Sequence, residues 1–158
     1  MRKLGIGLVI IVLSVIGLNN SSFAHCEIPC GIYGDSVRVA LIAEHIGTIE
    51  KSMKQISELS VEKTVDYNQL VRWVSNKEEH AKKIQEIATQ YFMFQRIKLT
   101  DDSAVKAKNQ KLLAKLHELC VYAMKAKQTT DLVYIEKMRK VLHDFSHLYF
   151  GKGHKHKH

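Results

Sequence analysis

A chain of 158 residues, of which 46% are hydrophobic and 25% charged, is long enough for one domain with a buried core. Its formal net charge of +8 at pH 7 comes from lysines and arginines scattered along the chain, several of them at the two ends. Such a weak and scattered charge argues against a nucleic-acid-binding protein. It would favour encounter with a small anion modestly.

Residues 1–24 have the features of a secretory signal peptide. A basic pair follows the initiator Met, residues 4–18 are an almost unbroken apolar run, and small residues occupy the positions that signal peptidase recognises up to Ala24. A run of about 15 residues is shorter than the roughly 20 needed to span a bilayer, so cleavage is favoured over a membrane anchor. We therefore expect signal peptidase to release an exported protein, periplasmic or extracellular, that begins at His25 and has no further membrane association.

Residues 25–34, called the hook below, concentrate unusual chemistry. Their sequence, HCEIPCGIYG, contains two cysteines, a histidine and the chain's single proline. The third cysteine is Cys120, and an odd number is unusual for a disulfide framework in an exported protein. A disulfide between Cys26 and Cys30 would close a very short loop and stabilise little. Another role for these thiols is therefore favoured.

Cleavage before His25 would create a set of metal ligands. The new amine, the next amide nitrogen and the thiolates of Cys26 and Cys30 supply two nitrogen and two sulfur donors. Tetragonal sites of this kind suit divalent nickel or copper, and metal-bound thiols are deprotonated. Pro29 restricts the turn that would bring Cys30 back to Cys26. The pattern indicates a nickel or copper site, with a small terminal disulfide as the alternative.

Four amphipathic segments follow the hook, and their apolar residues recur at helical spacing. These segments cover residues 37–56, 70–92, 112–123 and 132–149. Asp35 or Ser36 is the predicted N-cap of the first helix. Helices of about 20 to 30 residues joined by short polar segments predict an all-α, up-down four-helix bundle over residues 35–150. The remaining GKGHKHKH, residues 151–158, is a histidine- and lysine-rich tail that we expect to be disordered.

Three further residues carry simpler interpretations. Cys120 stands between apolar neighbours on a predicted helix, so we expect a buried apolar thiol rather than a ligand. His143 and His147 lie one helical turn apart and could form a second metal pair. No acidic residue accompanies them at that spacing, so a metal site there is not favoured.

The hook resembles that of nickel-containing superoxide dismutases, whose pattern is His-Cys-x-x-Pro-Cys-Gly-x-Tyr. Every defined position is matched in residues 25–33, and weaker similarity continues through the segments IEKSM, NKEEHA and QYF. The resemblance implies a four-helix bundle that disproportionates superoxide anion to dioxygen and hydrogen peroxide. It also implies one nickel ion per subunit, cycling between Ni(II) and Ni(III).

The resemblance implies a role for each site residue. His25 would provide its amine and an axial imidazole, Cys26 its amide nitrogen and thiolate, and Cys30 the second thiolate. Tyr33 would stand over the open face of the metal, where it orients a small anion and a proton source. Tyr91, in the segment QYF, would be a second tyrosine near the site.

The partners of the axial imidazole are left open by the sequence. An acid and an arginine hold it in some relatives, and the possible residues here are Glu44, Arg72, Glu78 and His80. The alternative function is a non-enzymatic, exported nickel- or copper-binding helical bundle. Such a carrier needs exchangeable metal and no gate, so Tyr33 and the proline turn argue against it.

The oligomeric state follows from the same resemblance, which implies a closed homohexamer. A hook at one end of a monomer would expose its thiolates to oxidation, and a neighbouring subunit could cover it. Aromatic residues beyond a single apolar stripe are the predicted contact residues, namely Trp73, Phe92, Phe94 and Tyr122.

Overall fold

The computed structural model describes residues 34–151. The predicted signal peptide, the hook before Gly34 and the tail after Gly151 lie outside the described residues. The described part forms helices α2 (Asp35–Leu59), α3 (Tyr67–Glu86), η1 (Ile87–Arg96), α4 (Ser103–Lys127) and α5 (Val133–Phe150), and it contains no strand. None of these helices is long and apolar enough to cross a membrane.

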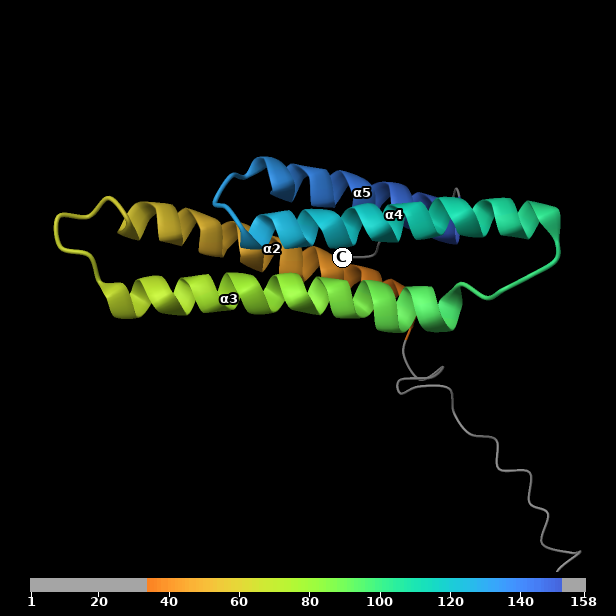
Figure 1. The fold of residues 1–158 in the computed structure, drawn as a ribbon, viewed down its shortest axis with the longest axis horizontal. Helices are drawn as coiled ribbons and strands as arrows, with labels where there is room; N and C mark the ends of the chain where they lie inside the picture. The colour runs from red at the N-terminus through yellow and green to blue at the C-terminus, as the bar shows by residue number, and fades with distance from the viewer. Residues whose placement is uncertain (1–33, 152–158) are drawn as a thin grey trace, which may run out of the picture.

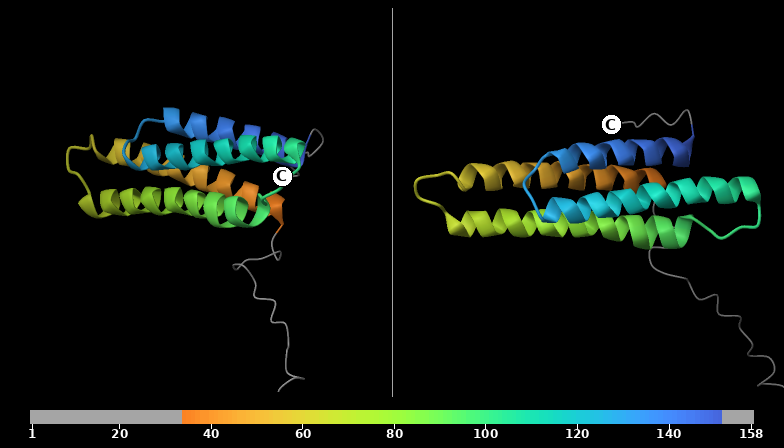
Figure 2. Two further views of the ribbon diagram at one scale, coloured as in Figure 1. Left: turned by 45° about the vertical axis from the view of Figure 1, so that its right-hand side comes forward. Right: turned by 45° about the horizontal axis from the view of Figure 1, so that its top comes forward.

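The helices alternate in direction and pack in cyclic order (Figure 1). α2 contacts α3 and α5, and α4 contacts the same two helices from the other side. η1 continues α3 without a break. The arrangement is an up-down four-helix bundle, so the predicted all-α fold is confirmed. Two further views place the beginning of α2, η1 and the end of α5 at one end of the bundle (Figure 2).

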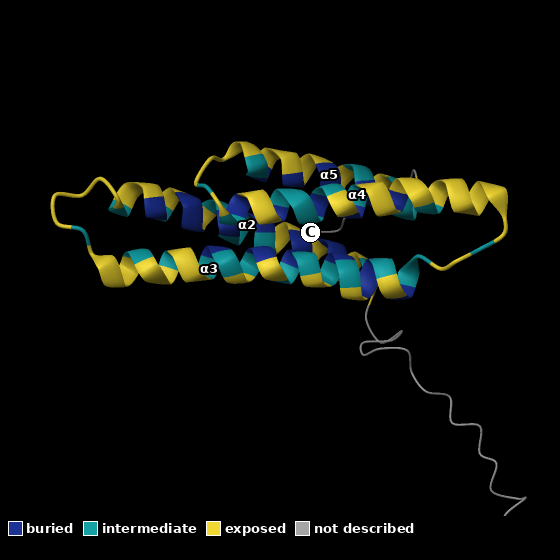
Figure 3. Cartoon of the chain, viewed as in Figure 1, coloured by how far each residue is buried: buried dark blue, intermediate teal, exposed yellow. Residues whose placement is uncertain are grey.

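The core lies along the bundle axis and receives apolar side chains from all five helices (Figure 3). Phe92 and Phe145 are fully buried and meet edge to face, with ring centroids 4.9 Å apart. Each such side chain stabilises the fold by about 1.5–3 kcal/mol relative to an exposed position. Predicting Phe92 as a subunit-contact residue was therefore wrong, because its ring fills the core. Phe94, by contrast, is 65% exposed.

The first helix begins differently from the prediction. Its N-cap is Gly34, which offers no side-chain bond, and Asp35 is already helical. Predicting Asp35 or Ser36 as the cap was therefore wrong. Asp66 and Asp102 do cap α3 and α4, accepting hydrogen bonds from first-turn backbone N–H groups at 2.9–3.1 Å. The carboxylate of Asp35 is left available for contacts with other helices.

The π-helix η1 was not predicted from the sequence, which indicated a continuous α-helix. The backbone N–H of Ile97 donates to the carbonyl of Phe92, five residues earlier, at 3.0 Å. In an α-helix, residues five apart point about 140° away from each other. Bonds between residues i and i+5 widen the turn and bring such residues to one side. Tyr91 and Arg96 are five residues apart, and η1 lets their side chains meet.

Candidate functional site

The predicted metal ligands His25, Cys26 and Cys30 and the predicted gate Tyr33 lie outside the described residues. Their geometry therefore stays a prediction. Tyr91 is the predicted site residue that the described part contains. It lies on η1, at the end of the bundle where the hook joins α2.

Tyr91 is buried, with 3% of its surface exposed, and its hydroxyl has two charged partners. The hydroxyl donates to Asp35 Oδ1 at 2.6 Å and accepts from Arg96 Nη2 at 2.7 Å. The guanidinium carbons of Arg96 and Arg38 lie 4.8 and 5.3 Å from the centre of its ring. The phenol is therefore held by its hydroxyl and by its ring.

Asp35 gathers these contacts at the start of α2. Its Oδ2 accepts a hydrogen bond from the Tyr149 hydroxyl at 2.9 Å, and Arg96 Nε lies 2.8 Å from Oδ1. We refer to Asp35, Tyr91, Arg96 and Tyr149 as the Asp35 cluster. It ties α2 to η1 and α5 at Asp35, one residue after the described part of the chain begins.

Electrostatics keep the Asp35 cluster in one protonation state. Burial raises the pKa of Asp35, but hydrogen bonds from Tyr91 and Tyr149 and the charge of Arg96 outweigh it and hold that pKa below 3.8. Burial, and then the carboxylate, raise the pKa values of Tyr91 and Tyr149. At neutral pH the cluster is therefore an ionised carboxylate with two protonated tyrosines and a guanidinium.

Sequence reasoning identified Tyr91 in this cluster and missed its three partners. Asp35 was assigned to helix capping, and Tyr149 to the apolar stripe of the last helix. Arg96 carried no signal, because its approach to Tyr91 depends on the π-helical turn. Tyr149 places a polar hydroxyl in the last turn of a helix face that is otherwise apolar. This feature could have identified it as a residue with a polar partner.

An open surface depression of about 390 Å³ adjoins the cluster. Its lining combines Arg38 and Glu86 with Ile87, Gln90 and the side of Tyr91. Arg38 gives this surface a positive charge near the hook junction, which favours a small anion. Glu86 partly offsets that charge.

The residues considered as partners of the axial imidazole fall into two groups. Glu44 and His80 belong to one neighbourhood between α2 and α3, since Glu44 influences the pKa of His80. Arg72 is exposed and forms no hydrogen bond or ion pair with the described residues. Glu78 lies beside Lys77, whose pKa it influences. None of the four belongs to the Asp35 cluster.

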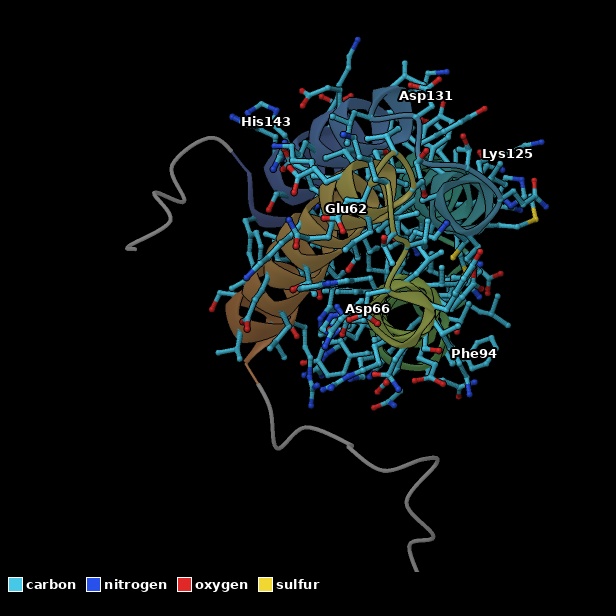
Figure 4. All side chains as sticks on the ribbon, turned by 90° about the vertical axis from the view of Figure 1, so that its left-hand side faces the viewer. Glu62, Asp66, Phe94, Lys125, Asp131 and His143 are labelled. Atoms are coloured by element: carbon cyan, nitrogen blue, oxygen red, sulfur yellow. The ribbon has the colours of Figure 1, made fainter. Side chains whose placement is uncertain are left out.

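Other ligand-type side chains in residues 34–151 do not gather into a site of three or more. Cys120 is a free, half-buried thiol, and burial raises its pKa, as expected of an apolar position. His143 and His147 place their ring centroids 5.0 Å apart on the outside of α5, where Figure 4 shows His143. A metal centre of three or more such ligands would therefore need the hook.

Comparison with protein families gives one finding that bears on this site. The model of nickel-containing superoxide dismutase matches residues 20–153. Comparisons with curated proteins and with solved structures give no match. The matched span includes the hook, the Asp35 cluster and all the helices of the bundle.

Proposed function

The chain belongs to the nickel-containing superoxide dismutase family, an oxidoreductase family, and we propose that it disproportionates superoxide at a nickel centre held by its processed N-terminus. The observation that carries this proposal is the donor set of the hook. It directly follows a predicted signal-peptidase site and lies within the matched span.

The donor set fits nickel. His25, Cys26 and Cys30 would hold one nickel ion per subunit, through the amine, an amide nitrogen, two thiolates and the imidazole. Nickel, when bound, supplies the one-electron change between Ni(II) and Ni(III), and anionic thiolate and amide donors favour its higher state. Soft sulfur donors combined with nitrogen also suit nickel better than magnesium or calcium.

The chain's own residues position the substrate and the hook. The reaction consumes two superoxide anions and two protons and yields one dioxygen and one hydrogen peroxide. Tyr33 would orient the anion and help deliver protons. The Asp35 cluster begins two residues after Tyr33 and ties the start of α2 to η1 and α5, so it would anchor that end of the hook. Arg38 and Arg96 add positive charge at the same end, which favours encounter with an anion.

We assign Tyr91 a positioning role within this proposal. Its hydroxyl proton points to the carboxylate of Asp35, and its oxygen accepts from Arg96. Burial and the carboxylate raise its pKa, so the phenol holds its proton at neutral pH. These contacts support a residue that fixes the base of the hook rather than one that exchanges protons with substrate.

Maturation and assembly complete the proposal. Signal peptidase would cleave after Ala24, export the protein to the periplasm or beyond, and free the amine of His25. The mature chains would form a homohexamer that covers each hook with a neighbouring subunit. Export and assembly rest on the leader and on the family resemblance.

Mass spectrometry of the native purified protein tests the nickel centre directly. We expect an N-terminus at His25 and one nickel per chain. A chain that keeps Ala24 should bind little nickel and be inactive, because its amine is blocked by a peptide bond. Cys26→Ser should lose nickel redox activity with the helices intact, whereas Cys120→Ser should keep both. Full activity in the chain that keeps Ala24 would contradict the proposal.

A further inference from the structure

A second pair of metal-ligating side chains lies between α2 and α3, away from the Asp35 cluster. His45 on α2 and His80 on α3 bring their Nδ1 atoms to 3.1 Å from each other. Their ring centroids are 4.9 Å apart, with the ring planes at 77°. His45 follows Asp35 by ten residues, or about 15 Å along the helix. The pair is therefore a separate feature of the bundle.

We propose that His45 and His80 bind a divalent late transition-metal ion, Zn²⁺ or Ni²⁺, that links α2 to α3. Imidazole nitrogens bind zinc at about 2.0–2.1 Å, so two of them on one ion lie about 2.9–3.4 Å apart for right-angled to tetrahedral geometry. The observed Nδ1 separation falls within this range. Both side chains are half-buried, so solvent can complete the coordination.

The protonation state of the pair suits metal binding. Burial, and then the charge of nearby Lys83, lower the pKa of His80, while burial, His80 and Lys83 lower that of His45. Both imidazoles are therefore neutral at pH 7, which is the form that binds a metal. Without metal, one Nδ1–H donates to the other Nδ1, and metal binding would require that ring to carry its proton on Nε2 instead.

An acidic neighbour provides a counter-charge for a bound cation. Glu44 directly precedes His45 and influences the pKa values of both imidazoles. Glu79 directly precedes His80, but it is paired with Lys83 at 2.7 Å. Glu44 forms no ion pair with the described residues, so its charge is the one that can balance a bound cation. The two imidazoles and water would form the coordination shell.

Thermal unfolding of the full chain tests this site once the hook is disabled. In a Cys26→Ser/Cys30→Ser background, Zn²⁺ and, separately, Ni²⁺ should raise the melting temperature, because an ion that binds the folded state stabilises it. His45→Gln and His80→Gln should each remove this rise, and acidification below the imidazole pKa values should weaken it in the parent. His117→Gln is the matched control, since His117 is exposed on α4.

A second measurement keeps the test independent of stability. Co²⁺ should give visible d–d absorption in the same background, and that signal should be lost in His80→Gln and kept in His117→Gln. An equal thermal shift and an equal cobalt spectrum in His45→Gln or His80→Gln would overturn the proposal and assign the binding to other histidines. Since the hook thiolates are absent throughout, this outcome is independent of the proposed nickel centre.

Discussion

Asp35 joins three helices through one carboxylate. As the first helical residue after the hook, it could have capped α2, but Gly34 takes that position. The carboxylate instead accepts hydrogen bonds from Tyr91 and Tyr149 and lies against Arg96. Hydrogen bonds to a charged group contribute about 1.5–3 kcal/mol each, more than a typical neutral pair. Asp35 therefore contributes more here than a surface N-cap would.

Tyr91→Phe tests the contribution of one hydroxyl to this cluster. The ring keeps its packing, but Asp35 loses one donor and Arg96 loses one acceptor. We expect the free energy of unfolding to fall by about 1–3 kcal/mol in urea denaturation. Nickel content should not change, because the predicted ligands remain. Turnover should fall, because Asp35 loses a contact proposed to fix the base of the hook. Tyr67→Phe is the control, since Tyr67 is 72% exposed and should change neither quantity.

Asp35→Asn tests the charge of the cluster through its pH dependence. The pKa of Asp35 is lower in the folded chain than its ordinary value of 3.8, so the unfolded chain takes up a proton first as the pH falls. The stabilisation from the carboxylate is thus complete above about pH 4 and is lost as the pH falls through the lowered pKa. In urea denaturation at pH 7, the free energy of unfolding should be higher for the wild type than for Asp35→Asn. This difference should become smaller as the pH is lowered towards 2.5. A difference that does not change with pH would contradict this account.

The helices show which features of a fold the sequence predicts. Four periodic segments and their polar joints predicted α2, α3, α4 and α5, because a bundle helix must bury one apolar face. The π-helical turns of η1 were not predictable, since the segment Ile87–Arg96 keeps an ordinary helical pattern of apolar residues. The wider turn depends on contacts with other helices, such as those of Tyr91 and Phe92. The spacing of apolar residues within one segment does not predict such contacts between helices.

Lys77 shows a second contact between elements that the sequence did not indicate. It is 5% exposed, and its Nζ donates to the carbonyls of Lys127 and Thr129 at 2.8 and 3.1 Å. These carbonyls lie at the C-terminus of α4, where the helix dipole favours a cation. A lysine of α3 thus donates hydrogen bonds to carbonyl groups at the end of α4 that have no donor within their own helix.

Lys77→Met should lower the free energy of unfolding by about 1–3 kcal/mol, because the new side chain fills the space but leaves two carbonyls without a charged donor. Urea denaturation gives the value. Lys82→Met on the same helix is the control: the Lys82 side chain is 69% exposed and forms a loose ion pair of 3.6 Å, worth about 0–1 kcal/mol. Equal losses in the two variants would show that the hydrogen bonds from Lys77 to α4 contribute nothing.

At the scale of the whole molecule, the proposed site would combine a local sequence motif with a cluster of residues that are far apart in the chain. The hook is contiguous, so its predicted ligand types and their spacing can be read directly from residues 25–33. The Asp35 cluster joins Asp35 to Tyr149, which is 114 residues away in the chain. That meeting depends on the lengths and registers of all the intervening helices. The sequence therefore predicts candidate metal ligands, which lie outside the described residues, but it could not predict the contacts of Asp35 with Tyr91, Arg96 and Tyr149.

The described surface also bears on how subunits would meet. Several large apolar side chains of α3 and η1 are exposed, namely Tyr67, Val71, Val74 and Phe94. Tyr67, Val71 and Val74 are spaced to share one face of α3. Phe94 follows Tyr91 by three residues and lies at the outer edge of the bundle (Figure 4). These exposed side chains therefore lie in two groups: Tyr67, Val71 and Val74 at the start of α3, and Phe94 in η1, at the end of the bundle where α2 begins.

We expect a homohexamer of the mature chain in which Phe94 is a contact residue. Burying a Phe side chain contributes about 1.5–3 kcal/mol, and a carboxylate in its place would have to be desolvated. Phe94→Asp should therefore shift light scattering towards smaller species without changing the helical circular dichroism. Val61→Asp is the control, because Val61 is 84% exposed in the loop at the opposite end. An unchanged hexamer in Phe94→Asp would exclude Phe94 as a contact residue. A stable, fully active monomer of the unmodified mature chain would refute the homohexamer. The hook thiolates would then need another protection against oxidation.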